Sequence, residues 1–455
     1  MLAMQRIGRR SLVAALVLVS LIAWGCAEDP ATGPDLARAP GGGGKGPSVK
    51  STSPSSAPRG TTLNVRVLGS AFDNGSRATW ALNGDTTFVN TRVRTNTTTF
   101  VSSTELVANI TIEADAALDL FDVVVVTLAG KKGIGIELFE VTLQIVDLGL
   151  GDGSTAQAVN DKNQIVGRGG TASGAFLWET GSVRDLGVLP GMSSSSAEDI
   201  NELGQVVGYS GNASGGFRGF VWTSSGGIKP LSTLGGCCSE ARAINESGVI
   251  AGSSALPGDA VWHAVIWDAN GVIHDIQTIV GGSSFAWGIN DNGQVVGQWN
   301  GPVNQRAFRY TPTLPAGTQM ELLQGIGGPQ GVAIEINSAG TVVGWSEPSP
   351  GGTFRATTWE GNMVTDLGTL GGISSVAAAI TDDGRVVGRS DTGVRRSGAL
   401  QFIGFLWTAA DRMQGLGLSP GIDYAQAWGI NANGWIVGES WVARGIGHAT
   451  LWKFQ

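Results

Sequence analysis

The chain has 455 residues, of which 15% are charged, and its formal net charge is −8 at pH 7. This length allows two or three domains, each with a sizeable core, and the thinly spread acidic charge, without a basic stripe, excludes nucleic acid as an expected partner. Glycine (71 residues) and tryptophan (15 residues) exceed ordinary usage. Such a mixture favours many short strands joined by tight turns.

Residues 1–25 are predicted to be a signal peptide. Three arginines in the first ten residues precede an apolar stretch, residues 11–22, that is too short to span a membrane comfortably. The stretch ends in Ala23-Trp24-Gly25-Cys26, which resembles a bacterial lipobox with alanine where leucine is usual. The resemblance implies cleavage before Cys26 and lipidation of its thiol. An ordinary secretory signal or a twin-arginine signal is the alternative.

Residues 26–46 are rich in proline and glycine and contain almost no apolar side chains. Such a segment cannot bury a core and is expected to be a flexible tether behind the lipidated cysteine. We therefore expect an exported protein that is lipid-anchored to the bacterial membrane, at the outer membrane or the cell surface.

Residues 47–142 are predicted to form a β-sandwich, because strand-like alternation is interrupted there by turn formers. The segments Ser53–Gly60 and Val67–Phe72 are similar to those of the immunoglobulin-like IPT/TIG domains, a family of spacers and binding modules in surface proteins. The clearest predicted strands are 63–68, 105–112 and 121–126.

Seven copies of one unit follow, within residues 143–455. Each copy has a Val-Val-Gly or a close variant, and the spacings between successive glycines are 41, 44, 45, 47, 44 and 50 residues. With four expected strands per unit, this period predicts a seven-bladed β-propeller; a β-solenoid is the structural alternative. These glycines are Gly167, Gly208, Gly252, Gly297, Gly344, Gly388 and Gly438.

Other positions repeat with the glycines. A turn residue, asparagine in six copies and Thr381 in one, is followed three residues later by glycine, or by Asn163 in the first copy. Both residue types tolerate the positive φ that a short hairpin needs. Four residues before each turn residue stands an alanine, which indicates a crowded position. The turn residues are Asn160, Asn201, Asn245, Asn290, Asn337, Thr381 and Asn431, and the alanines are Ala156, Ala197, Ala241, Ala286, Ala333, Ala377 and Ala427.

The repeated units resemble the HAF repeats of bacterial extracellular proteins, over residues 147–455. The closest copy contains Asp366–Gly372 followed by Arg385–Gly388. The resemblance implies an exported protein and transfers neither an activity nor catalytic residues.

We find no pattern for a metal or a cofactor, because the three histidines lie far apart and no CxxC spacing occurs. Cys237 and Cys238 are adjacent in a loop between copies. In an oxidising compartment they are hypothesised to form a vicinal disulfide, with free thiols as the alternative.

The last copy ends without a fourth strand, whereas residues 141–149 carry the motif of one. This segment is therefore predicted to pair with the third strand of the last copy and to join the chain ends. Loops of variable length then share one face, and three of them are predicted to carry ligand-binding tryptophans. These are Trp299, Trp345 and Trp441.

The sequence as a whole predicts non-catalytic binding of a protein or glycan through the propeller, at the cell surface. A propeller hydrolase or lyase acting on polysaccharide is the second hypothesis, and a structural role in a surface layer is the third.

Overall fold

The computed structural model describes residues 46–83, 90–113, 116–169, 174–396, 398–419, 421–443 and 445–453. Within these ranges every regular element is a strand, and the strands form nine four-stranded sheets. The prediction of an all-β protein is therefore confirmed.

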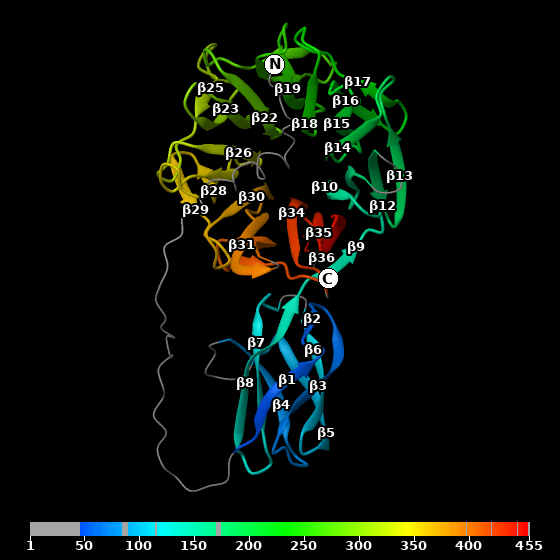
Figure 1. The fold of residues 1–455 in the computed structure, drawn as a ribbon, viewed down its shortest axis with the longest axis vertical. Coiled ribbons are helices and arrows are strands. Elements are labelled where there is room, and N and C mark those ends of the chain that lie inside the picture. Colours follow the sequence, from blue (N-terminus) through cyan, green and yellow to red (C-terminus); the bar gives the residue numbers. More distant parts are fainter. Residues whose placement is uncertain are drawn as a thin grey trace. The chain divides into compact units, whose positions relative to one another are not determined.

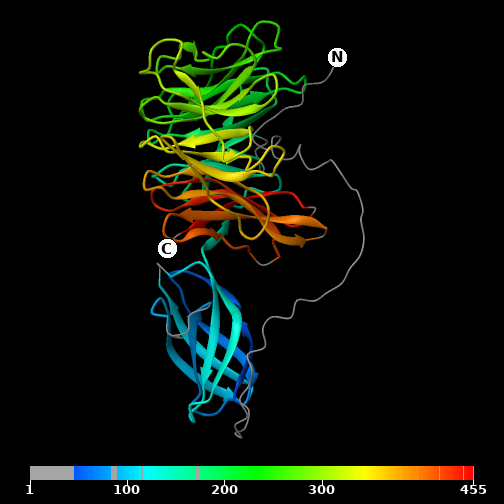
Figure 2. The ribbon, with the colours of Figure 1, turned by 90° about the vertical axis from the view of Figure 1, so that its left-hand side faces the viewer.

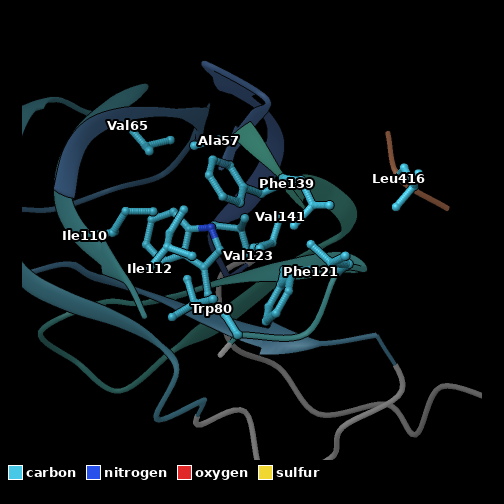
Figure 3. Packing of buried hydrophobic residues seen from close by; sticks show 14 of the residues in the cluster. Ala57, Val65, Trp80, Ile110, Ile112, Phe121, Val123, Phe139, Val141 and Leu416 are labelled. Atoms are coloured by element: carbon cyan, nitrogen blue, oxygen red, sulfur yellow. The ribbon is translucent and has the colours of Figure 1, made fainter. Parts of the chain in front are cut away.

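Two of the sheets are formed by residues 48–142 and share one apolar core. Alternate side chains of their strands point inward, and Trp80 packs edge-on against Phe139 with ring centroids 6.0 Å apart (Figure 3). One sheet has the order β1 (Ser48–Ser53), β3 (Thr62–Ser70), β6 (Glu105–Ile112), β5 (Val93–Ser102), and the other β2 (Ser56–Pro58), β8 (Lys132–Thr142), β7 (Leu120–Val126), β4 (Arg77–Leu82).

The remaining seven sheets follow one another around a common centre, and the first strand of each sheet is innermost (Figure 1). Figure 2 shows the same sheets from the side. Six of them run in chain order. They are β10 (Thr155–Val159), β11 (Ile165–Arg168), β12 (Ala175–Glu179), β13 (Ser182–Gly187); β14 (Ser194–Ile200), β15 (Val206–Gly211), β16 (Phe217–Thr223), β17 (Gly227–Pro230); β18 (Ser239–Ile244), β19 (Ile250–Ala255), β20 (Trp262–Trp267), β21 (Ile273–Asp275); β22 (Ser283–Ile289), β23 (Val295–Asn300), β24 (Gln305–Tyr310), β25 (Met320–Leu322); β26 (Gly331–Ile336), β27 (Val342–Ser346), β28 (Arg355–Glu360), β29 (Met363–Asp366); and β30 (Ser375–Ile380), β31 (Val386–Arg396), β32 (Ala399–Thr408), β33 (Arg412–Gly415).

The seventh sheet joins the two ends of the repeat region. It contains β34 (Tyr424–Ile430), β35 (Ile436–Trp441) and β36 (His448–Lys453), and its fourth strand is β9 (Gln144–Asp147) from before the first copy. β9 runs antiparallel to β36, with Asp147 opposite Thr450. The predicted pairing of the chain ends is confirmed.

The repeated asparagines link neighbouring sheets. The Oδ1 of Asn290 accepts the N–H of Gln294 at 3.0 Å and closes its own turn, while its Nδ2 donates to the carbonyl oxygen of Asn337 in the next sheet at 3.0 Å. All six asparagines make the corresponding inter-sheet bond, and Asn431 donates to Asn160 of the first sheet. We call this series of bonds the asparagine ladder.

Thr381 accepts the N–H of Arg385 as its counterparts do, at 3.1 Å, but has no amide to donate onward. Arg385 makes the link instead, because its Nη2 donates to the carbonyl of Ala432 in the seventh sheet at 2.8 Å. The predicted positive φ is present in every turn, from 62° at Asn163 to 84° at Gly340 and Gly384.

The repeated alanines and glycines meet at a bulge in the first strand of each sheet. In β14, Ala197 pairs with Gly208 and Asp199 with Val207, so that Glu198 is the extra residue. A Cβ on Gly208 would lie 2.0 Å from the carbonyl oxygen of Ser196, which is why this position is glycine. The seven alanines are at most 1% exposed.

Candidate ligand-binding surface

The seven sheets have two different ends. The asparagine turns lie at one end, which we call the turn face. The second strand of each sheet leads into the third at the opposite end, which we call the loop face, and there the fourth strand also leads into the next sheet. The second strands run from the turn face to the loop face, so residues after the repeated glycine approach the loop face.

The three predicted tryptophans lie in strands and not in the loops, which corrects the sequence prediction. Trp299 is in β23, Trp345 in β27 and Trp441 in β35. Trp345 is only 6% exposed and packs on Phe354, with ring centroids 4.3 Å apart. Trp345 is therefore a core residue in this structure.

The other two tryptophans are half-buried. The indole Nε1 of Trp299 donates to the carbonyl of Gly281 at 2.9 Å, and Trp441 stacks on Tyr424 at 5.6 Å. Trp345, Trp299 and Trp441 stand one, two and three residues after the repeated glycine. Because side chains alternate along a strand, the first and third point to one side of their sheets and Trp299 to the other. The three do not form one cluster.

A different set of aromatic side chains is contiguous at the loop face. Phe217 of β16 stacks on Trp262 of β20 at 5.5 Å, and Trp262 stacks on Phe285 of β22 at 6.1 Å. Tyr209 of β15 meets Phe217 edge-on at 6.2 Å. These four half-buried residues, which we call the aromatic row, cross the second, third and fourth sheets.

A buried charged cluster adjoins the aromatic row. The guanidinium of Arg242 donates to Glu198 at 2.9 Å and to Glu240, and its carbon lies 5.2 Å from the ring centre of Tyr209 and 4.9 Å from that of Trp287. Arg242, Glu198 and Trp287 are the bulge residues of three successive sheets. The bulges therefore bring together side chains that are about 45 residues apart in the chain.

Burial and the neighbouring charges shift the pKa values of Glu240, Arg242 and Tyr209. Burial, with a smaller effect from Glu198, raises the pKa of Glu240 although Arg242 lowers it. Burial alone would lower the pKa of Arg242, but the two carboxylates raise it above its ordinary value, so the guanidinium stays charged. Burial and Glu198 also raise the pKa of Tyr209, which favours the neutral phenol.

Sequence reasoning missed both the aromatic row and the charged cluster. A signal was present, because the residue after each repeated alanine differs from copy to copy. The seven are Gln157, Glu198, Arg242, Trp287, Ile334, Ala378 and Trp428. When one position varies among repeats that are otherwise alike, the fold does not determine its residue type, and the position is available for a function.

Cys237 and Cys238 lie between β17 and β18 and are joined by a disulfide in the structure. The backbone N–H of Cys237 donates to Asp259 at 2.7 Å. The oxidation state in the cell stays a prediction.

Intact-mass analysis tests the disulfide. After alkylation without a reductant, a chain expressed from residue 47 should carry no label, because both sulfurs are bonded; after reduction it should carry two. Two labels before reduction would contradict the pairing.

Within the described ranges, no group of three or more His, Cys, Asp or Glu side chains could hold a metal ion. Those ranges also contain no helix long and apolar enough to cross a membrane. The predicted lipidation site, Cys26, lies outside the described residues.

By its fold the protein is an all-β protein whose main part repeats one four-stranded sheet seven times. No family model and no curated protein matches the chain. Among solved structures, TolB from Acinetobacter baumannii is 12% identical over 53% of this chain and 57% of its own, with a TM-score of 0.34. The chain thus spans little more than half the length of TolB.

Two further structures are similar to larger shares of the chain. A gluconolactonase from Xanthomonas campestris is 10% identical over 68% of this chain and 90% of its own, with a TM-score of 0.33. An auxiliary nutrient binding protein from Bacteroides ovatus is 10% identical over 90% and 98%, with a TM-score of 0.27. These TM-scores are too low to support a conclusion about function.

Proposed function

We propose that this protein is an exported, lipid-anchored and non-catalytic binding protein. Cys26 carries the lipid, residues 26–46 are the tether, and residues 47–142 are an immunoglobulin-like domain of the IPT/TIG type. The seven sheets are HAF-type repeats that form a closed seven-bladed β-propeller, and its loop face binds a protein or glycan ligand.

The observation that carries the binding role is the aromatic row. Half-buried aromatic rings supply large contact areas at low entropic cost, and they are enriched at binding sites for that reason. On the turn face, by contrast, the buried asparagine side chains already bind neighbouring sheets through the asparagine ladder, so their amides are not available to a ligand.

The charged cluster supports binding over catalysis. Glu198 and Glu240 are both bound to Arg242, which holds the two carboxylates in fixed ion pairs. A hydrolase needs a carboxyl group that exchanges protons with substrate, and a tyrosine nucleophile needs a lowered pKa, whereas burial raises that of Tyr209.

Trp262→Ala tests the binding face. A glycan array and a pull-down with residues 47–455 would first supply a ligand, and its Kd should then rise about ten-fold in the variant because one stacking surface is lost. Leu203→Ala is the matched control, since Leu203 is 71% exposed on the turn face. Binding that is lost in Leu203→Ala and kept in Trp262→Ala would contradict the assignment.

Cys26→Ser tests the anchor. The variant should leave the membrane fraction, because the acyl chains supply the membrane affinity at about 0.8 kcal/mol per buried CH₂. Cell fractionation with an immunoblot measures this. A variant that stays membrane-bound would show that the lipobox interpretation is wrong.

A further inference from the structure

A second arginine near the centre of the ring contrasts with Arg242. Arg389 of β31 directly follows the repeated glycine of its sheet and is half-buried. Its Nη1 donates to the Oε1 of Gln426 at 3.3 Å, and its guanidinium carbon lies 5.3 Å from the ring centre of Phe402. Among the described residues no carboxylate forms an ion pair with it, whereas Arg242 has two.

The acid that acts on Arg389 is Glu439 of β35, and it is held by other groups. Glu439 is 5% exposed, accepts the hydroxyl of Thr155 at 2.9 Å, and accepts a bond from the amide Nε2 of Gln426. Gln426 thus stands between the two charges. Burial lowers the pKa of Arg389 to about 10, with Glu439 opposing the shift, so the side chain remains a cation at neutral pH.

Two buried polar atoms on the bulges of the seventh and first sheets have no hydrogen-bond partner among the described residues. They are the indole Nε1 of Trp428, whose residue is 8% exposed, and the amide Oε1 of Gln157, whose residue is 5% exposed. Both are bulge residues, in β34 and β10. These strands touch at this point, because a Cβ on Gly429 would lie 3.1 Å from the carbonyl oxygen of Gln157.

The groups Arg389, Gln426, Trp428, Glu439 and Gln157 come from the sixth, seventh and first sheets, and we call them the closing sector. It offers guanidinium donors without a carboxylate, one indole donor without an acceptor and one amide acceptor without a donor. A buried polar group without a partner is unfavourable, so a ligand that pairs these groups gains affinity. A guanidinium prefers a carboxylate, which it can bind through two parallel bonds.

We propose that the closing sector binds a sugar that carries a carboxylate. The carboxylate pairs with Arg389, one hydroxyl oxygen accepts the indole N–H of Trp428, and one hydroxyl donates to the Oε1 of Gln157. This inference deepens the proposed function and rests on it, because it assumes that the protein binds a ligand. It concerns a different sector from the aromatic row, so the two can fail separately.

Calorimetry on the full chain with D-glucuronate, an oligogalacturonate and D-glucose tests the proposal. Both uronates should bind, and glucose should bind at least about ten-fold more weakly because it lacks the carboxylate. Arg389→Gln should weaken uronate binding about ten-fold or more, and Arg389→Lys should recover only part of it. Equal binding of glucose and glucuronate, or no binding of either uronate, would overturn the proposal.

Trp428→Phe separates a ligand-binding role from a structural one. It removes the indole N–H, which has no partner in the unliganded protein, together with part of the buried ring, so the melting temperature without ligand should fall slightly. Glucuronate affinity should fall about three-fold or more. Unchanged glucuronate affinity would overturn the proposal, whatever the melting temperature. If Trp262→Ala abolishes binding of the array ligand while uronates do not bind at all, this inference fails and the proposed function stands.

Discussion

Replacing Asn290 by alanine should lower the free energy of unfolding by about 3 kcal/mol. The substitution removes the bond to the carbonyl of Asn337 in the next sheet and leaves the N–H of Gln294 without its acceptor. Asn290 is 5% exposed, so water cannot readily replace these partners, and each unpaired buried group costs about 1–3 kcal/mol. Urea unfolding followed by tryptophan fluorescence measures the loss.

Two variants sharpen this test. Asn292→Ala is the control, because Asn292 is exposed although its amide donates to Ser338 in the next sheet; it should cost less than about 1 kcal/mol. Asn290→Thr should cost less than Asn290→Ala, since Thr381 shows that a hydroxyl can close the turn without linking the sheets. Equal costs for Asn290→Ala and Asn292→Ala would show that the ladder contributes no stability.

Replacing residues 144–148 by Gly-Ser-Gly-Ser-Gly should lower the melting temperature of the repeat region by about 5 °C or more. The change keeps the chain length but removes the apolar side chains of β9 and Leu148, which pack against the seventh and first sheets. It also leaves β36 as an unpaired edge, which should promote concentration-dependent association. Differential scanning calorimetry and light scattering report the two effects.

The same five-residue replacement at 212–216 is the control for the closing strand. This loop between β15 and β16 is mostly exposed and already contains two glycines. It should shift the melting temperature by less than about 2 °C. If the replacement at 144–148 shifted the melting temperature no more than the replacement at 212–216, β9 would be dispensable for the stability of the seven repeated sheets.

Features that depend on local geometry could be predicted from the sequence. The positive φ of Gly204, the crowded site of Ala197 and the pairing of β9 all follow from residues within one copy or from the absence of a strand in the last. The asparagine ladder was not predictable, because each link joins residues 41 to 47 apart in the chain, or 271 apart at the closure.

The binding surface was predicted only in part. The loop face does carry the aromatic row, but Trp345 was assigned to a loop because the sequence does not show how far β27 extends beyond its glycine. Whether a strand side chain is buried also depends on the loop that follows it, and Phe354, just before β28 of the same sheet, covers Trp345. Glu198, which binds Arg242, and Gln426, which binds Arg389, could not be predicted because each comes from another copy.

Strand β9 also affects how the molecule responds to a mechanical force. β8 ends at Thr142 and β9 begins at Gln144, so a force that pulls residues 48–142 away from the repeated sheets passes through β9. Because β9 lies alongside β36, a load directed along the strand shears their hydrogen bonds together and does not unzip them one by one. A contact of 2.9 Å between Nδ1 of His448 and Oδ2 of Asp147 lies at the same junction. The strand that completes the seventh sheet thus also resists the mechanical separation of that sheet from residues 48–142.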